Sequence, residues 1–493
     1  MDNNKEYRGI VKGTAIFGGV QVFTMIIAML RGKFIAMLLG PAGMGVSALL
    51  VSTVNMINQV SSLGLNMGAV RDISMANASG DLTKLSYVVK IFRRLVFITG
   101  ILGALISIIG SRWWSEIAFG TNEYTLAFII LGAMLLLTAL ASGEQAFLQG
   151  TRHLKNLAKT TLIGSFTGLL VGIPMFFFWG TRGIAPAMVA LALVTYLSNK
   201  YFAGKINLIP VLISPKETFK YAGSIVPFGV ALATGQLLGT LSIFFVNWFI
   251  RYTGSIADVG LYQATTSITT QYMGFVFSAM AVDYFPRLTA VSGENELVTR
   301  LVNQQAEIVM LVIAPLVLGL MSMAPLVVLV LLSEDFLVIV PVLRWVGFAL
   351  FFVAAIFPLG YISFAKGDKK IFFLLDGVLS NIVMIVCAVI GYITWGFMGL
   401  GVAKLVSSGV MLVIMGVIVC WRYKFRFEMK YIQLFLVLFG CCLVAFVLSF
   451  IVTDYLQYGI ISGVIFIVSG LYCFRELNTR IKIVELVKSK LGR

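Results

Sequence analysis

The chain has 493 residues, of which 59% are hydrophobic and only 12% are charged, and its mean hydropathy is +0.97. A water-soluble domain would carry about 25% charged residues. The composition therefore excludes a soluble protein and places the chain in a lipid bilayer.

Apolar segments of membrane-spanning length follow one another along the whole chain. A spanning helix needs about 20 apolar residues. Turn chemistry separates several segments, at Gly40-Pro41, at Gly180 to Gly183 and at Trp395-Gly396. We predict an all-α polytopic membrane protein with about 14 transmembrane helices, at 11–39, 44–70, 86–110, 124–149, 157–179, 184–203, 218–250, 256–282, 298–331, 338–365, 371–393, 397–419, 431–452 and 458–474.

The basic residues explain the net charge of +16. With the N-terminus in the cytoplasm, 30 of the 37 Lys and Arg residues fall in inner segments, and Arg112, Arg182, Arg251 and Arg344 fall in outer connections. This is the bias expected of cytoplasmic loops, so no nucleic-acid partner is needed. We predict that both termini are cytoplasmic. Most tryptophans fall at predicted outer ends, as aromatic belts require.

A weak internal repeat divides the chain. The loop GPAGMGVSALLVS (40–52) follows the first predicted helix, and GSIADVGLYQATTS (254–267) follows the seventh. Each opens a helix with a polar face, which would line a cavity or bond to other helices. We predict two six-helix lobes, 1–205 and 206–420, and two additional helices with a tail, 421–493. The polar faces carry Ser52, Asn55, Gln59, Ser62 and Asn66 in one helix, and Gln263, Thr266, Ser267 and Thr270 in the other.

Three cations lie inside predicted spans, where charge is costly and usually functional. Arg31 lies about 12 Å inside the predicted outer end and Lys404 about 10 Å inside the same side. Two cations at matched depth in the two halves could bind a phosphate or diphosphate. Lys33 lies about 200° around the helix from Arg31, so both cannot face one cavity. The alternative for each is that its side chain reaches the interface.

Acidic residues lie in the inner part of the predicted membrane. Glu144 and Asp376 are each about 8–9 Å deep, and Asp283 and Glu307 lie nearer the inner surface. Buried carboxylates of this kind can bind a coupling proton or Na⁺. An interhelical salt bridge or an interfacial acid is the alternative.

No pattern in the sequence indicates catalysis, a cofactor or a metal site. There is no P-loop, so ATP does not drive the chain by itself. The five cysteines have no zinc spacing and suggest no disulfide framework, and the single histidine, His153, lies in a basic turn. We predict a protein that is not an enzyme.

Four sequence patches resemble the polysaccharide repeat-unit flippases of the O-antigen or Wzx type. They are RGKFIAMLLGPAGMGVSALL (31–50), SLGLNMGAVRDIS (62–74), DVGLYQATTSI (258–268) and AVDYFPRLT (281–289). These flippases share a superfamily with the multidrug MATE exporters and the lipid II flippases. The resemblance implies two bundles around a central cavity that opens alternately to each side of a bacterial cytoplasmic membrane. Arg31 looks like the cationic residue in the first helix of this superfamily's carriers of lipid-linked substrates.

The resemblance also implies an undecaprenyl-diphosphate-linked oligosaccharide as cargo, and a polysaccharide polymerase and assembly proteins as partners. The diphosphate would contact Arg31 and Lys404, while the polar faces would line the sugar path. Two alternatives stay open. A cation-coupled multidrug exporter of the same fold should instead present acids and aromatics in its outer cavity. A membrane scaffold that transports nothing would turn its interior charges toward contacts between lobes.

Overall fold

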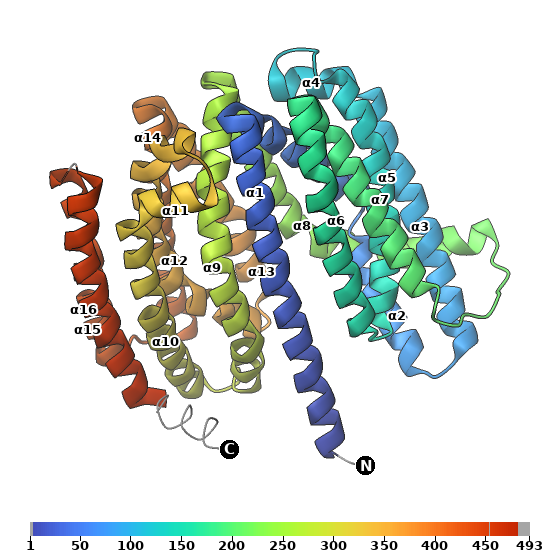
Figure 1. Ribbon diagram of the computed structural model, residues 1–493. Coiled ribbons are helices and arrows are strands. Elements are labelled where there is room, and N and C mark those ends of the chain that lie inside the picture. The colour runs from blue at the N-terminus through green and yellow to red at the C-terminus, as the bar shows by residue number, and fades with distance from the viewer. Residues whose placement is uncertain (1–2, 453, 482–493) are drawn as a thin grey trace, which may run out of the picture. The chain divides into compact units, whose positions relative to one another are not determined.

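The structure is a computed structural model, and it describes the chain from Asn3 to Ile481 apart from residue 453. Side chains are described from residue 19 to residue 480, except at 67, 224–228, 231–232, 272, 275, 279, 282 and 453. The described chain is helical and contains no strand (Figure 1). It divides into two compact units, Met1–Gly260 and Leu261–Arg493. The lobe boundaries predicted from the internal repeat, at 205/206 and 420/421, stay predictions.

The first unit is built from long helices joined by short turns. It contains α1 (Asn3–Ser61), α2 (Leu65–Ala78), α3 (Leu82–Ile109), α4 (Ser111–Phe119), α5 (Thr125–Gly150), α6 (Leu154–Trp179), the 3₁₀ turn η1 (Gly180–Gly183), α7 (Ile184–Ala203), α8 (Pro215–Thr253) and the start of α9 (Ile256–Ala290).

Helix α1 contains the first predicted span and most of the second. It changes direction at Gly40, whose φ of 63° is open to glycine at little cost, and Pro41 begins the next segment. The predicted helix 44–70 is wrong in one respect, because the chain leaves the helical path at Leu63 and Gly64 (φ 50° and 66°). The polar face predicted for this helix is therefore interrupted, and Asn66 belongs to α2.

Two glycines allow the part of α1 just after its bend at Gly40 to contact the start of α9. A Cβ atom on Gly45 would lie 1.9 Å from the carbonyl oxygen of Ile256, and one on Gly260 would lie 1.9 Å from that of Pro41. These two contacts lie between the two glycine-containing segments that the internal repeat relates to each other, which the structure places at the bend of α1 and at the start of α9. We call this close contact of main chains the glycine seam.

The connection between α7 and α8 lies along α3. Its carbonyl groups accept hydrogen bonds from the side chains of Lys90 (to Val211) and Arg94 (to Ile213, 2.8 Å). A capping box at Ser214 and Glu217 then begins α8. The connection is therefore fixed to the first unit by polar contacts with its main chain.

The second unit contains the rest of α9, α10 (Asn295–Ser322), α11 (Ala324–Leu331), the 3₁₀ helix η2 (Glu334–Ile339), α12 (Val340–Ala365), α13 (Lys369–Phe372), the π-helix η3 (Phe373–Leu379), α14 (Ser380–Tyr423), α15 (Met429–Ile451) and α16 (Tyr455–Ile481). Helix α14 bends at Trp395 and Gly396, where two spans were predicted. The predicted span 298–331 is also divided, at Met323 between α10 and α11.

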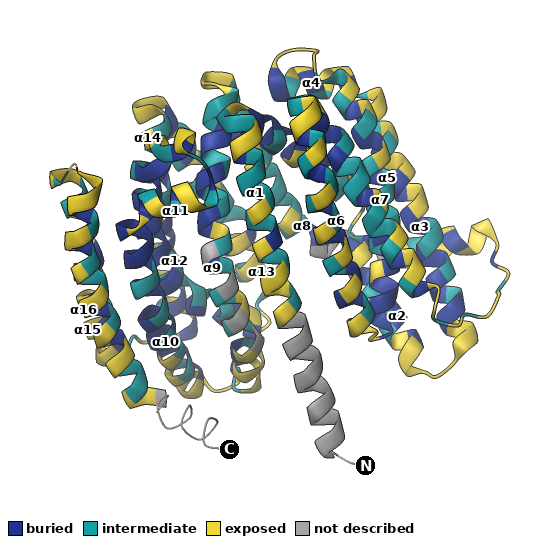
Figure 2. Cartoon of the chain, viewed as in Figure 1, coloured by how far each residue is buried: buried dark blue, intermediate teal, exposed yellow. Residues whose placement is uncertain are grey.

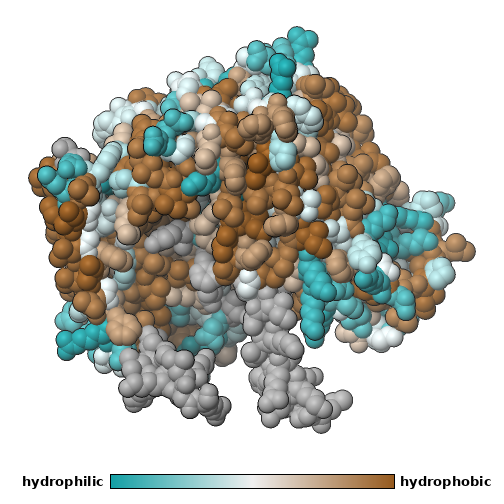
Figure 3. All heavy atoms as spheres, in the orientation of Figure 1, coloured by the Kyte–Doolittle hydropathy of each residue, from teal (hydrophilic) through white to brown (hydrophobic). Residues whose placement is uncertain are grey.

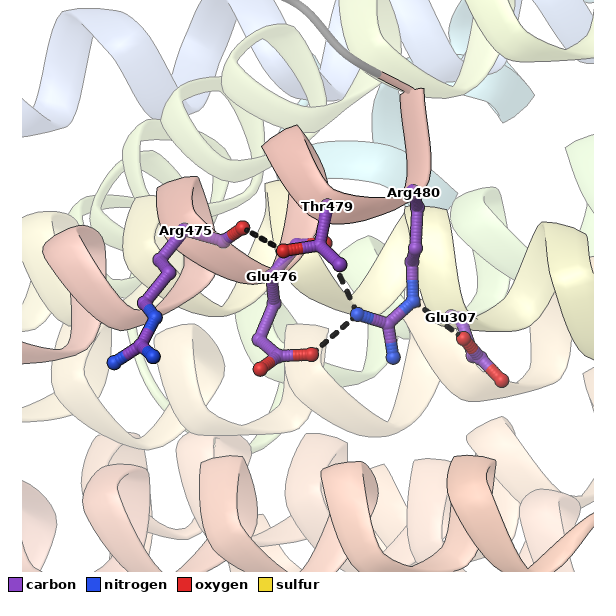
Figure 4. Close-up of polar contacts among 5 residues, drawn as sticks. All are labelled: Glu307, Arg475, Glu476, Thr479 and Arg480. Carbon is purple, nitrogen blue, oxygen red and sulfur yellow. Dashed lines mark hydrogen bonds and ion pairs between the residues drawn. The ribbon is translucent and has the colours of Figure 1, made fainter.

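The last two helices are bound to the second unit by side-chain contacts. Aromatic rings of α12 and α15 pack against one another along the two helices, as in the tilted pair Phe348 and Phe446, whose ring centroids are 5.1 Å apart. On α16, Arg480 Nε lies 2.6 Å from the carboxylate of Glu307 on α10, and its Nη1 donates to Glu476 (Figure 4). Glu307, one of the acids predicted near the inner surface, therefore forms an interhelical ion pair.

Arg344 was counted with the outer connections, and the side of the membrane on which it lies stays a prediction. It lies in the first turns of α12 and is only 5% exposed. Its guanidinium carbon lies 3.8 Å from the ring centroid of Tyr458 on α16. A cation over the face of a tyrosine ring is attracted by the ring quadrupole, so this contact adds to the attachment of α16.

Long apolar helices confirm the polytopic fold. Within the part of the chain that the structure describes, ten ranges are long and apolar enough to cross a membrane. Three of them contain a bend or turn between two crossings, namely Gly19–Ser61, Leu154–Ala203 and Lys369–Tyr423. The 35-residue α9 completes a total of about fourteen. Figure 2 shows exposed residues on outward faces of the helices, and Figure 3 shows that much of this surface is hydrophobic.

Candidate substrate-binding site

A polar cavity of about 260 Å³ lies inside the first unit, between α1, α5, α6 and α7. Helix α1 contributes Thr24, Ile27, Ala28 and Arg31, which share one face because they are spaced by three or four residues. Arg31 is half-buried. The spacing therefore turns this intramembrane cation into the cavity.

The opposite walls carry hydroxyl and amide groups. Three threonines, Thr160 and Thr161 on α6 and Thr195 on α7, donate their hydroxyl protons to main-chain carbonyls of their own helices. Each hydroxyl proton is already used, so these groups offer lone pairs to a ligand. Gly164 lets α7 approach, since a Cβ there would lie 3.0 Å from Thr195 Oγ1. The remaining polar groups come from Gln145, Ser165 and Asn199.

Asn199 is fully buried in the cavity wall, at 2% exposure. Its Nδ2 donates to the carbonyl of Ala141 at 3.2 Å, which fixes the amide orientation. Its Oδ1 has no partner among the described residues. A buried acceptor without a donor costs about 1–3 kcal/mol, so this oxygen is suited to a donor supplied by a bound molecule or by water.

The charge in the cavity is unbalanced. Among the residues that the structure describes, no hydrogen bond or ion pair is formed by the guanidinium of Arg31, and no Asp, Glu or aromatic residue lines the cavity. A half-buried guanidinium is a strong, bidentate donor for phosphate or carboxylate oxygens. The arrangement suits a ligand that has an anionic group next to hydroxyl donors.

The three other candidates on α1 do not line the cavity beside Arg31. Lys33 is half-buried but is not part of the cavity wall. Asn55 is exposed and Gln59 is half-buried, and neither lines the cavity. The roles of these three residues in binding stay predictions.

The candidates Lys404, Gln263 and Thr266 all belong to the second unit. Lys404 is half-buried on α14, beyond the bend at Gly396. Gln263 and Thr266 are half-buried neighbours on α9, where the hydroxyl of Thr266 donates to its own helix. Binding of one diphosphate by Arg31 together with Lys404 stays a prediction.

The two coupling-ion candidates have different surroundings. Glu144 is 7% exposed and its Oε2 lies 2.6 Å from Nη2 of Arg93 on α3, which is the interhelical salt bridge considered as the alternative. Asp376 is exposed and lies in the π-helix η3, a form frequent at functional sites. Coupling through either carboxylate stays a prediction.

The sequence argument missed the walls on α6 and α7. Their signal was present in the run TTLIGS (160–165) and in the four-residue spacing of Leu191, Thr195 and Asn199. Both patterns place small polar groups on one face of an apolar helix. Without the structure, nothing indicated that these faces meet Arg31.

The fold is that of a class of polytopic membrane transporters. A multidrug resistance MATE transporter of the MOP superfamily, solved in an inward-facing conformation, matches with a TM-score of 0.70 at 17% identity, over 83% of this chain and 98% of that one. The lipid II flippase MurJ, solved in an inward closed conformation, matches with a TM-score of 0.71 at 14% identity, over 95% and 99% of the two chains.

The sequence comparison identifies the family. The family model described as "Polysaccharide biosynthesis protein" matches residues 34–341, and the chain belongs to this family. The lipid III flippase of Escherichia coli (strain K12) is 21% identical over 351 residues, which cover 71% of this chain and 83% of that protein. The lipid III flippase of Shigella flexneri matches to the same extent.

Proposed function

We propose that this protein is a flippase that moves a lipid-diphosphate-linked oligosaccharide from the inner to the outer leaflet of a bacterial cytoplasmic membrane. The observation that carries the proposal is the cavity beside Arg31. It joins a cation without a carboxylate partner, among the described residues, to a wall of hydroxyl and amide acceptors. The family and the relatives that flip lipid III support the same class of cargo.

In this proposal Arg31 holds the diphosphate and the polar walls accept hydrogen bonds from the sugar hydroxyls. The lipid tail stays in the bilayer. Dehydrating charged and hydroxyl-rich groups in hydrocarbon would be very costly, so a polar path lowers the barrier to translocation. Rocking of two lobes around the bound headgroup would open the path to each side in turn.

A cation-coupled multidrug exporter is the second candidate, because the MATE fold matches well. A site for organic cations is expected to present acids and aromatic faces. The described wall of the cavity has neither and presents Arg31 instead. The charge of the cavity therefore favours an anionic cargo. The proposal includes an oligosaccharide repeat unit as the glycan. It also includes a polysaccharide polymerase and assembly proteins as partners.

The test is the effect of Arg31→Ala on surface polysaccharide in cells that depend on this protein. We expect Arg31→Ala to abolish export at normal expression and insertion, and Arg31→Lys to restore part of it, because lysine keeps the charge but loses the bidentate fork. The matched control is Arg112→Ala, which removes an exposed arginine of α4. Full export by Arg31→Ala would contradict the proposal.

A further inference from the structure

A second polar cavity, of about 70 Å³, lies where α1 gives way to α2. Asn58, Ser61 and Ser62 reach it from the end of α1, and Asn66 from the start of α2. Thr99 on α3 and Ser142 on α5 close the other sides. All of these residues belong to the first unit, and none of them lines the cavity beside Arg31.

The packing enforces the break that creates this cavity. Leu63 and Gly64 have left-handed φ values of 50° and 66°, so the helical path cannot continue. A Cβ atom on Gly64 would lie 2.1 Å from the carbonyl oxygen of Gly229 on α8. The main chains of the break and of α8 therefore touch, and this interrupted helix is a built feature of the fold.

Four hydroxyl groups around the break, those of Ser61, Ser62, Thr99 and Ser142, have acceptors for their protons. The single hydroxyl proton of Ser142 can be donated to the carbonyl of Ala139 at 2.7 Å or to Asn66 Oδ1 at 3.0 Å. Thr99 donates to the carbonyl of Val96 at 3.2 Å, and Ser61 and Ser62 donate to carbonyls of α1. These four oxygens can therefore offer lone pairs to a ligand in the cavity.

The charges around the cavity select the kind of ligand. A helix carries partial negative charge at its C-terminal end, and the last turn of α1 forms one wall. No Asp, Glu, Lys or Arg is among the described lining residues. Neutral oxygens suit a hard cation, but a divalent ion would stay uncompensated in an apolar surrounding.

We propose that the break between α1 and α2 holds a small monovalent cation, Na⁺, bound by neutral oxygens of α1, α2, α3 and α5. Interrupted membrane helices bind coupling ions in this way, through carbonyls and half-helix C-terminal ends. The cavity is large enough for one ion, since a single water needs only about 10–15 Å³. Glu144, two residues beyond Ser142 on α5, is already paired with Arg93.

The experiment measures binding of ²²Na⁺ to the purified full-length protein in choline chloride. Wild type should bind Na⁺ saturably, and Thr99→Val and Ser142→Ala should each weaken binding by about tenfold or more, because each removes one oxygen next to the ion. The control is Thr53→Val, a fully buried threonine of α1 whose hydroxyl bonds within its own helix. It should bind Na⁺ like wild type.

Two results would overturn the proposal. One is the absence of saturable ²²Na⁺ binding by wild type, which would make the cavity a water site. The other is wild-type binding by both Thr99→Val and Ser142→Ala. Ser142 is only half-buried, so Ser142→Ala keeps the test decisive if Thr99→Val does not fold. The result is independent of which substrate the protein carries, because no substrate is present in the assay.

Discussion

Substituting a glycine of the seam should destabilise the protein strongly. In Gly45→Ala the new Cβ would meet the carbonyl oxygen of Ile256 at 1.9 Å, whereas real Cβ contacts essentially never come within 3.0 Å. The start of α9 must therefore move by about 1 Å away from α1, because the contacted oxygen belongs to the main chain and the position of the new Cβ is fixed by its own main chain. Overpacking of this kind costs about 1–3 kcal/mol.

The assay is the midpoint of thermal aggregation of the purified protein in detergent. Gly45→Ala should lower the midpoint by about 2–5 °C. The matched control is Gly32→Ala on the same helix, because a Cβ there meets nothing within 4 Å. Alanine is the better helix former by about 1 kcal/mol, so this variant should be as stable as wild type or more stable. Equal midpoints for Gly45→Ala and Gly32→Ala would refute the close contact.

Three further predictions follow from charges. Arg422 donates a hydrogen bond to Asp368 and lowers the pKa of that carboxyl below its ordinary value of 3.8. The stabilisation is therefore present above about pH 4 and is lost as the pH falls further. In Asp368→Asn, the free energy of unfolding should depend less on pH in the acid range. Arg480→Gln, which leaves the carboxylate of Glu307 without this partner, should destabilise by up to about 3 kcal/mol, and adding Glu307→Gln should recover part of the loss in thermal melts. Reporter fusions should place residues 153, 210, 368 and 425 inside and residues 120, 181, 255 and 395 outside, and a consistent reversal across 255–395 would exclude the predicted topology.

The sequence was sufficient for the fold class because hydropathy and turn residues act locally. The bends at Gly40 and at Trp395-Gly396 were visible as turn chemistry. The break at Leu63 was not, because its cause is the contact of Gly64 with α8, far away along the chain. The burial of Arg344 was not visible for a related reason, since the tyrosine that covers it lies on α16.

The candidate site was only partly predictable. An intramembrane arginine is unusual enough to be found from the sequence alone, and Arg31 does line a cavity. The threonines and Asn199 opposite it are ordinary in apolar helices, so only the packing of α6 and α7 distinguishes them. Whether a buried acid is paired also depends on a distant partner, as the contact of Glu144 with Arg93 illustrates.

The most direct test of the central claim is translocation by the purified protein in liposomes. A lipid-diphosphate oligosaccharide placed in the inner leaflet would be probed with a glycosidase that cannot cross the membrane. We predict that wild type exposes the oligosaccharide to the enzyme and that Arg31→Ala leaves it protected, as in liposomes without protein. Protection with wild type, together with transport of an organic cation dye, would contradict the flippase and favour the drug exporter.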